Sequence, residues 1–434
     1  MDLIEKQNNK VDKAIIPALR FPDFVNDGEW KKDTFENTFL FLPNNTLSRA
    51  ELNYENGSTK NVHYGDVLIR FGDCLDVQTN ALPFISDEAI ADRLQSSRLQ
   101  DGDVIIADTA EDETVGKCTE IFNVSGENVV SGLHTIPIRP KIQFAIPYLG
   151  FYFNSDSYRK QLLPLMQGVK VMSISKAAIG KTIVAYPNIL TEQCKIGSCL
   201  SSMDAYISAT KAKLELLKTY KKGLMQKLFP AKGKKMPELR FKEFEKDGEW
   251  EEKKLGEIVG IYDGIHQTPN YTNKGVMFVS VEDISTLKSN KFISEEDFYR
   301  DFKVYPQRGN ILMTRIGDIG TANVYDSDEL LAFYVSLALF KPKSINSYFL
   351  KHTIDSYYFQ YQLSIKTLHI AFPKKINKTE LESILVYCPS VSEQRKIADC
   401  LTSIDEMINQ YSNKIALLKQ YKKGLMQQMF PTSK

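Results

Sequence analysis

The sequence lacks several features that would place a protein at a membrane or in a secretory pathway. No apolar run approaches the roughly 18 residues that a membrane-spanning helix needs. The N-terminal stretch MDLIEKQNNKVDKAII is polar and contains no signal-peptide core. The formal net charge is only +1, which excludes a uniformly basic nucleic-acid coat and leaves a local basic face possible. We therefore expect a cytoplasmic protein that does not contact a membrane.

Signatures of cofactor binding and catalysis are missing as well. The six cysteines include no C-x-x-C pair and no histidine at ligand spacing, which is typical of reduced thiols and not of a zinc site or disulfide framework. No G-x-x-x-x-G-K-[ST] phosphate loop is present. There is also no Asn- or Asp-Pro-Pro-aromatic stretch of the kind that adenine methyltransferases use, and no convincing nuclease cluster. The sequence predicts no cofactor, no metal site and no catalytic residue.

What the sequence does contain is a long repeated segment. Residues 191–230 return as residues 392–431 with a constant offset of 201 and no gap. Apolar residues recur in steps of three and four along both copies, which predicts a coiled-coil seam. The predicted ends are Thr191 and Ser392 as N-caps, followed by Glu192 and Glu393, and the terminators Pro230 and Pro431. We expect two helices of about 57 Å that pair with each other in antiparallel fashion.

A second repeat precedes each long helix. The stretch PALRFPDFVNDGEW at 17–30 returns as PELRFKEFEKDGEW at 237–250, and the two copies hold both tryptophans of the protein. We expect these tryptophans to anchor each half of the chain. The chain is thus predicted to be a tandem duplication. Its parts are a globular region at 1–190, a helix at 191–230, a second globular region at 231–391 and a helix at 392–434.

The two globular regions share a pattern of elements although their sequences differ. Strands are predicted at Gly102–Ile106 and Gly309–Met313, at Thr135–Pro140 and Ser336–Pro342, and at Asp66–Phe71 and Val276–Val281. An aromatic helix is predicted at Tyr148–Tyr158 and again at Tyr348–Tyr361. The expected fold class is mixed α/β, with two globules joined by two long antiparallel helices. Residues 1–16 are a charged extension, with a short helix as one possibility.

Two globules of one fold but different surfaces, joined by helices of fixed length, would keep their binding surfaces at a fixed distance from each other. If each globule binds a short duplex segment, the helices set the distance between two half-sites about one helical turn of DNA apart. A different class of function uses the same features: a coiled-coil scaffold that assembles proteins without DNA specificity. A single chain with its own nuclease or methyltransferase activity is the third, less favoured interpretation.

The whole layout resembles the specificity subunit of Type I restriction-modification systems. The resemblance is carried by the two P-x-L-R-F…D-G-E-W motifs, the two [ST]-E-Q-x-K-I…L-x-S-[MI]-D segments and the two L-L-K-x-Y-K-K-G-L-M-Q-x-[ML]-F-P endings. In the second globule, Gly264–Pro269, Val279–Ile284 and Leu312–Gly320 look like parts of that family's target recognition domains.

The resemblance implies two target recognition domains, each docking in a DNA major groove, with the conserved helices as spacer. It implies as partners double-stranded DNA, two modification subunits that methylate adenine, and restriction subunits that translocate and cut. Chemistry would then reside in those partners. A complex that only methylates, without a restriction subunit, is equally compatible with the sequence.

Arg315 is the leading candidate for reading a base, because it follows a predicted strand at a glycine-rich turn and Arg bound to guanine is the commonest specific contact. A surface salt bridge with Asp318 or Glu282 is the alternative. The loop of His266, Gln267 and Thr268 contacts DNA or is a simple turn. The remaining candidates in the second domain are Thr314, Lys274 and Asn323.

In the first domain, alignment of the strands places Asp108 opposite Arg315. An acidic residue accepts a hydrogen bond from cytosine where Arg donates to guanine, so the two domains would suit different half-sites. A carboxylate that caps a turn is the alternative role of Asp108. Further candidates are Arg70, Gln78 and Lys117, whereas His134 is expected to be a structural histidine at a strand start.

Residues that are identical in both long helices predict a separate partner surface. They include the pairs Gln193 and Gln394, Asp204 and Asp405, and Tyr220 and Tyr421. Duplicated surfaces on a pseudo-twofold helix pair could dock two copies of one partner. Recent duplication is the alternative explanation of the identity, although the globular regions have diverged and the helices have not.

Overall fold

The computed structural model describes residues 15–368 and 373–431. The chain forms two compact units, Met1–Thr210 with Lys414–Lys434, and Lys211–Asn413. We call them unit 1 and unit 2. Most of the predicted N-terminal extension, residues 1–14, lies outside the described residues. Among the helices that are described, none is long and apolar enough to cross a membrane.

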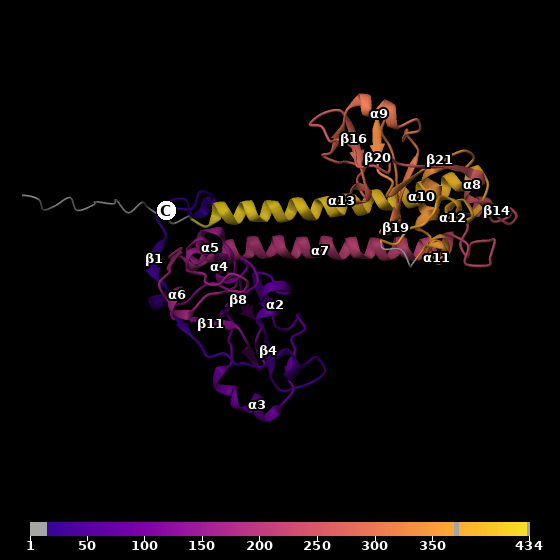
Figure 1. The fold of residues 1–434 in the computed structure, drawn as a ribbon. Coiled ribbons are helices and arrows are strands. Elements are labelled where there is room, and N and C mark those ends of the chain that lie inside the picture. The colour runs from indigo at the N-terminus through magenta and orange to yellow at the C-terminus, as the bar shows by residue number, and fades with distance from the viewer. Residues whose placement is uncertain (1–14, 369–372, 432–434) are drawn as a thin grey trace, which may run out of the picture. The chain divides into compact units, whose positions relative to one another are not determined.

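Two long helices, α7 (Leu190–Leu228) and α13 (Val391–Met429), each contain 39 residues, or about 58 Å of helix. Figure 1 shows them side by side. In unit 1, Ile196 and Leu200 of α7 share a core with Met429 of α13. In unit 2, Leu228 of α7 shares a core with Ile397 of α13. The start of each helix therefore packs near the end of the other, and the predicted antiparallel pair is confirmed.

The predicted N-caps of the long helices are wrong, because both helices begin one residue earlier than the predicted caps. The helices begin at Leu190 and Val391, so Thr191 and Ser392 lie inside the first turn. The hydroxyl of Ser390, ahead of α13, accepts a hydrogen bond from the Glu393 amide at 3.3 Å. A serine before the helix therefore supplies the cap in α13, and the threonine and serine of the repeat do not.

The globular part of unit 1 is built on a five-stranded sheet of order β2-β11-β7-β9-β5, beside a four-stranded sheet of order β10-β4-β6-β3. Two short pairs, β1 with β13 and β8 with β12, complete it. Its strands are β1 (Lys31–Thr34), β2 (Phe39–Phe41), β3 (Leu52–Asn53), β4 (Lys60–Val62), β5 (Cys74–Asp76), β6 (Phe84–Ile85), β7 (Val104–Ala107), β8 (Thr109–Ala110), β9 (Cys118–Phe122), β10 (Val129–Ser131), β11 (Thr135–Pro140), β12 (Met172–Ser173) and β13 (Ile183–Tyr186). Its shorter helices are α1 (Phe35–Thr38), α2 (Tyr64–Ile69), α3 (Glu88–Arg93), α4 (Leu149–Asn154), α5 (Asp156–Leu162) and α6 (Lys176–Gly180).

The globular part of unit 2 repeats this plan with fewer strands. A four-stranded sheet of order β15-β21-β18-β19 adjoins a three-stranded sheet of order β17-β16-β20, and β14 pairs with β22. The strands are β14 (Glu251–Lys254), β15 (Val259–Asp263), β16 (Val276–Val279), β17 (Phe292–Ile293), β18 (Ile311–Ile316), β19 (Asp318–Val324), β20 (Leu331–Phe333), β21 (Leu337–Pro342) and β22 (Leu385–Cys388). The shorter helices are α8 (Leu255–Ile258), α9 (Glu295–Asp301), α10 (Ser347–Asp355), α11 (Tyr357–Lys366) and α12 (Lys378–Glu382).

The predicted anchoring role of the two tryptophan motifs is confirmed. Trp30 and Trp250 are buried, and their rings meet Phe430 and Phe229 respectively, edge to face. Each motif also contributes an arginine to the first turn of a long helix. Arg20 holds the buried Glu192 through two hydrogen bonds of 2.7 Å. Arg240 holds Glu393 in the same way, at 2.8 and 2.7 Å.

Two predictions for the globular regions need correction. The predicted strand Asp66–Phe71 is the helix α2, which begins after His63, whose ring nitrogen accepts a hydrogen bond from the Gly65 amide. A short apolar run is compatible with either element, so periodicity alone could not separate them. Each predicted aromatic helix is a pair of helices, α4 with α5 and α10 with α11, which are separated at Ser155 and Ser356.

Candidate nucleic-acid interface

The end of the central strand lies in the same position in both globular parts. In unit 1, the Asp108 amide donates to the His134 carbonyl at 3.1 Å and its carbonyl accepts from the Ile174 amide at 2.9 Å. In unit 2, the Arg315 amide donates to Ser336 at 2.8 Å and its carbonyl accepts from Ile376 at 3.1 Å. The predicted alignment of Asp108 with Arg315 is confirmed by these matching hydrogen bonds.

The Asp108 carboxylate lies in a small polar cluster. Its Oδ1 accepts a hydrogen bond from the Thr109 hydroxyl at 2.7 Å and lies 3.3 Å from Nδ1 of His134. His134 adopts a φ of 54°, an uncommon backbone conformation for a residue with a side chain. Its exposed ring packs edge to face on Tyr64. Sequence reasoning treated His134 as structural, and the structure adds it to the cluster around Asp108.

Arg315 is held inside unit 2 by an acidic partner. Its side chain is 11% exposed and is paired with the carboxylate of Asp263, the last residue of β15. Its Nε is buried without a hydrogen-bond partner in the described part of the chain. The alternative predicted for Arg315 was a salt bridge to Asp318 or Glu282, and the ion pair found uses Asp263 instead. No local sequence signal links positions 263 and 315, because β21 brings them together.

Thr314 supports the hairpin that carries Arg315. Its side chain is buried, and its hydroxyl accepts a hydrogen bond from the Thr321 amide at 3.0 Å. The pairing of β18 with β19 shifts register between Met313 and Arg315. Such bulges redirect side chains at the ends of strands. Thr314 therefore shapes the position of Arg315 and offers no exposed surface itself.

The loop of His266, Gln267 and Thr268 is exposed and follows β15 by three residues. Ile265 forms a bridge with Tyr334, just before the strand β21, which places the loop at the same end of the sheet as Arg315. Lys274 is also exposed, and its carbonyl accepts a hydrogen bond from the Thr272 hydroxyl at 2.8 Å. Asn323 is half-buried and donates to the carbonyls of Ile284 and Ser285, both at 3.0 Å.

The candidates Arg70 and Gln78 make contacts that hold loops of unit 1 together. Arg70 donates to the Tyr54 hydroxyl at 2.7 Å and to the Ala81 carbonyl at 3.0 Å. The Gln78 amide donates to the carbonyls of Asn123 and Ser125 at 3.2 and 3.4 Å. Both side chains remain exposed, so these contacts leave part of each surface accessible.

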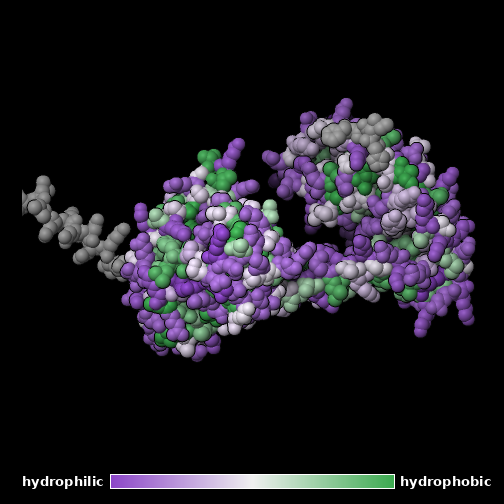
Figure 2. Space-filling model, turned by 90° about the horizontal axis from the view of Figure 1, so that it is seen from below, coloured by the Kyte–Doolittle hydropathy of each residue, from purple (hydrophilic) through white to green (hydrophobic). Residues whose placement is uncertain are grey.

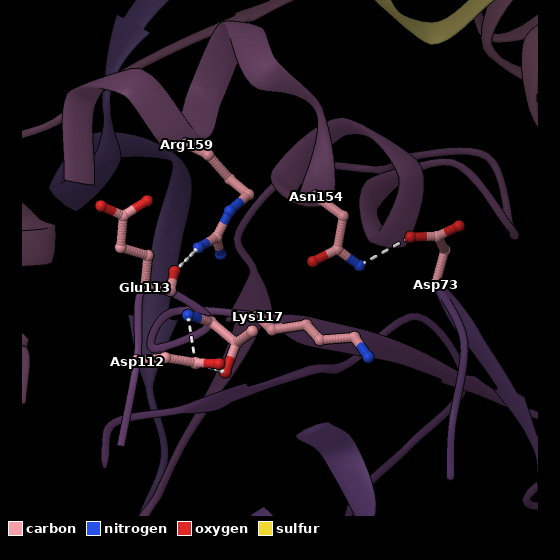
Figure 3. Close-up of a pocket in the computed structure, with 7 residues that line it drawn as sticks. Asp73, Asp112, Glu113, Lys117, Asn154 and Arg159 are labelled. Carbon is pink, nitrogen blue, oxygen red and sulfur yellow. Dashed lines mark hydrogen bonds between the residues drawn. The ribbon is translucent and has the colours of Figure 1, made fainter. Parts of the chain in front are cut away.

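Lys117 lines a cavity of about 670 Å³ in unit 1 (Figure 3). The other lining residues are Asp73, Asp112, Glu113, Thr114, Asn154 and Arg159. The Lys117 ammonium donates to the Leu68 carbonyl at 2.6 Å, and burial lowers its pKa. Burial also lowers the pKa of the Arg159 guanidinium, which donates to the carbonyls of Glu113 and Val115. The bases here support the loop between β8 and β9.

The six residues of the predicted partner surface fall into three kinds. Gln193 and Gln394 are buried, and each amide joins a backbone amide of the globular part to a backbone carbonyl ahead of its helix. They have no surface to offer a partner, and we do not retain them for that role. Asp204 and Asp405 bind lysines of the opposite long helix, Lys422 at 2.6 Å and Lys221 at 2.6 Å. Tyr220 and Tyr421 are 59% and 60% exposed.

Two lysine clusters at the helix pair were missed by sequence reasoning. Lys422 binds Asp73 as well as Asp204, and although burial opposes its charge, the two carboxylates raise its pKa. In unit 2 the arrangement is inverted, since Asp405 lies near two bases, Lys221 and Lys351. Burial, together with the charge of Lys351, lowers the pKa of the neighbouring His352 to about 3.

Comparisons with known proteins show which proteins share this sequence and fold. Residues 247–420 match the family model described as the Type I restriction modification DNA specificity domain. The chain is 25% identical over 356 residues to the putative type I restriction enzyme MjaX specificity subunit of Methanocaldococcus jannaschii, covering 76% of this chain and 77% of that protein. It is 28% identical over 253 residues to the type I restriction enzyme MjaVIII specificity subunit of the same organism, covering 55% of this chain and 59% of that protein. Over about three quarters of its length, the chain is therefore similar to Type I restriction-modification specificity subunits.

Solved structures share the fold of this chain. The Type I restriction-modification S subunit from M. genitalium matches with a TM-score of 0.61 and 13% identity, over 97% of this chain and 100% of that one. A chain from a study of assembly and conformational transition in the type I system matches with a TM-score of 0.54 and 17% identity, over 93% and 97%. The predicted fold class is confirmed. Specificity subunits are the non-catalytic DNA-specificity component of these systems, which agrees with the prediction that the chain is not itself an enzyme.

Proposed function

We propose that this specificity subunit reads an asymmetric bipartite DNA site and directs adenine methylation and restriction by partner subunits. One half-site would be read by the domain in 1–190 and the other by the domain in 231–391. The helices of 191–230 and 392–434 would set the gap. The partners in this proposal are double-stranded DNA, two modification subunits and restriction subunits. A subunit that acts on cellular DNA belongs in the cytoplasm, so that location is part of the proposal.

The observation that carries the proposal is the pair of equivalent strand ends with opposite charge. Asp108 and Arg315 make the same backbone hydrogen bonds in domains that otherwise share little sequence. A carboxylate accepts hydrogen bonds from cytosine, whereas a guanidinium donates two to guanine. A scaffold without DNA specificity would have no need for different polar groups at one repeated position. The difference therefore supports two unlike half-sites.

The ion pair of Arg315 with Asp263 fits a reading role in which the guanidinium is released onto DNA. Asp263 is itself exposed, and its carboxylate holds Arg315 at the strand end in the absence of a base. A guanine that presents two acceptors could replace the single carboxylate. The exposed loop of His266, Gln267 and Thr268 at the same end of the sheet would supply neighbouring contacts. Lys274, Asn323, Arg70, Gln78 and Lys117 stay secondary candidates.

The test is a genome-wide map of N6-methyladenine in cells that express this chain with its modification partner, compared with cells that lack it. The proposal expects one split motif, two short specific parts around a fixed gap, to depend on this chain. Asp108→Asn and Arg315→Gln should each change the preferred base in only one part of the motif, because amide side chains favour adenine. A map that does not change when the chain is removed would contradict the proposal and favour the scaffold.

A further inference from the structure

A small hairpin lies directly beside the strand end that carries Asp108. Gln167 and Ser173 exchange two backbone hydrogen bonds, of 2.9 and 2.8 Å, and close the hairpin. Its returning arm, β12, pairs with β8, the two residues that follow Asp108. The hairpin is thus joined by main-chain hydrogen bonds to the proposed reading position.

The tip of this hairpin exposes apolar side chains that its own chain does not cover. Val169 is 97% exposed and Val171 is 53% exposed, and Lys170 between them is exposed as well. Among the described residues, no other large hydrophobic side chain is as exposed as Val169. The turn is closed by Gly168, which has a φ of 117° and where a Cβ would lie 2.0 Å from the Val171 carbonyl oxygen. Only glycine fits there, so the chain can turn tightly at this position.

The other recognition domain has comparable backbone pairing beside its strand end. Leu368 and Lys375 form an isolated bridge, and Lys375 also bridges to Ile316, the residue after Arg315. The Gly317 amide donates to the Lys374 carbonyl at 2.8 Å. Lys374 and Lys375 are both exposed. In both domains, therefore, a second segment pairs with the chain just beyond the reading position and brings at least one exposed lysine with it.

We propose that this hairpin is a second DNA-contacting element of the first recognition domain, and that the segment of Lys374 and Lys375 has the same role in the second. In the first domain, Val169 contacts the methyl group of a thymine in the major groove and Lys170 contacts a phosphate. In the second domain, Lys374 and Lys375 contact phosphates. The inference rests on the proposed function, since it needs DNA at the strand ends. A thymine methyl is the one apolar group on the base edges of that groove, which also admits a two-stranded ribbon.

The lysines favour DNA over a protein partner as the occupant. A protein groove that accepted Val169 and Val171 would gain little from an ammonium group placed between them. A DNA groove is walled by phosphates on both sides, so a lysine next to an inserted apolar side chain meets a negative charge. The glycine turn makes the tip narrow, which suits insertion between two phosphate backbones.

The decisive experiment replaces each thymine of the first half-site in turn by deoxyuridine, which lacks only the methyl group. Binding is measured with the complex of the full chain and its modification subunits, for the wild-type chain and for Val169→Ala. At one position, the replacement of thymine by deoxyuridine should weaken binding of the wild-type complex by about fourfold, the value expected for one buried methyl group. The complex with the Val169→Ala chain should bind the thymine and deoxyuridine sites equally at that position. Ile69→Ala, at an exposed residue of unit 1, is the matched control and should keep the wild-type difference.

The lysines are tested by the salt dependence of binding. Lys170→Gln should reduce the slope of log K against log salt by about 1 without changing base preference, and so should Lys374→Gln or Lys375→Gln. Lys160→Gln, an exposed lysine at the end of α5, is the control and should leave the slope unchanged.

The outcomes separate this inference from the proposed function. If the wild-type complex binds its split site and no thymine shows a difference that depends on Val169, the hairpin assignment is wrong and the bipartite function stands. If the wild-type complex has no sequence preference, the proposed function fails and the hairpin assignment fails with it. If Val169→Ala removes the difference between thymine and deoxyuridine but the lysine variants keep the wild-type salt slope, the proposed phosphate contacts are wrong and the thymine contact stands.

Discussion

At the scale of single residues, a buried carboxyl in unit 1 stands out. Glu120 on β9 is fully buried beneath the start of α4, where its Oε2 accepts hydrogen bonds from the amides of Tyr148 and Gly150 at 2.8 and 2.9 Å. Its Oε1 has no partner in the part of the chain that the structure describes. Burial raises its pKa to about 8, although the two amides act in the opposite direction. At neutral pH the folded protein therefore holds a proton on Glu120 that the unfolded chain has already released.

This carboxyl predicts that unit 1 loses stability as the pH rises. Its folded pKa lies above its unfolded value, so its contribution is fully present below about pH 4.5 and is lost as the pH passes through about 8. The full effect is on the order of 3 to 5 kcal/mol, at about 1.4 kcal/mol for each pKa unit. Thermal unfolding of the full chain in a Trp250→Phe background, followed by the fluorescence of Trp30 between pH 6 and 9, measures the part of the effect above pH 6. Glu120→Gln should flatten this dependence, and Glu111→Gln, at an exposed position, should not.

At the scale of elements, the two long helices are joined by reciprocal ion pairs. Lys422 of α13 binds Asp204 of α7 in unit 1, and Lys221 of α7 binds Asp405 of α13 in unit 2. The four residues are related by the repeat offset of 201, since 204 + 201 = 405 and 221 + 201 = 422. Each pair is also shared with a globular part, through Asp73 in unit 1 and Lys351 in unit 2. The same contact thus holds helix to helix and helices to domain.

A change of charge sign tests this contact in unit 1. Lys422→Asp would place a third carboxylate beside Asp73 and Asp204 and should destabilise unit 1 by about 3 kcal/mol or more, as expected for a half-buried pair that loses one partner. Adding Asp204→Lys should recover a large part of the loss. Urea unfolding of the single and double variants measures the coupling. Lys423→Asp, at the neighbouring exposed lysine, is the control. Equal losses for the single and double variants would contradict the role of the pair.

The elements that the sequence predicted correctly are those with strong local patterns. The heptad spacing of the long helices and the two copies of the tryptophan motif could be read directly, as could the strands that follow Gly102 and Gly309. The segment at Asp66–Phe71 was misread because three apolar residues in a row fit a strand and a short helix equally well. Ion pairs such as Arg315 with Asp263 could not be predicted, because strand order brings together residues that are far apart in the chain. The same holds for Lys422 with Asp73.

At the scale of the whole molecule, the duplicated helices present duplicated apolar surface. Leu216 and Tyr220 lie one turn apart on α7 and are exposed, and Leu417 and Tyr421 repeat them on α13. Figure 2 shows hydrophobic surface among hydrophilic residues on the long helices. Exposed leucine and tyrosine side chains at matching positions of a repeat fit a surface that binds the same partner twice. Tyr220 and Tyr421 are the centres of these two candidate surfaces.

This arrangement predicts how many modification subunits each variant retains. The wild-type chain should bind two, Tyr220→Ala or Tyr421→Ala alone should retain one at working concentrations, and the double variant should retain none. A central tyrosine of an interface contributes about 2 kcal/mol or more, which is roughly a thirtyfold loss of affinity. Native mass spectrometry of the co-expressed complex counts the copies. Tyr271→Ala, an exposed tyrosine of unit 2 outside the long helices, should leave two. Two copies on the double variant would rule these surfaces out.

The division of the chain into two units has a consequence for its synthesis. Unit 1 takes in residues from 414 onward, and Met429 and Phe430 pack with Trp30 in one core while the Leu19 amide donates to the Gln428 carbonyl at 2.9 Å. More than 200 residues lie between Thr210 and Met429. A ribosome makes about 5 to 20 residues per second, so roughly 10 to 40 seconds pass between the synthesis of Thr210 and that of Met429. During this interval the N-terminal part of unit 1 lacks Met429 and Phe430, so its hydrophobic core is incomplete and the side of Trp30 that packs on Phe430 is exposed. A nascent chain that stops early would therefore remain a substrate for chaperones and proteases, and only a chain translated as far as Phe430 would close both halves.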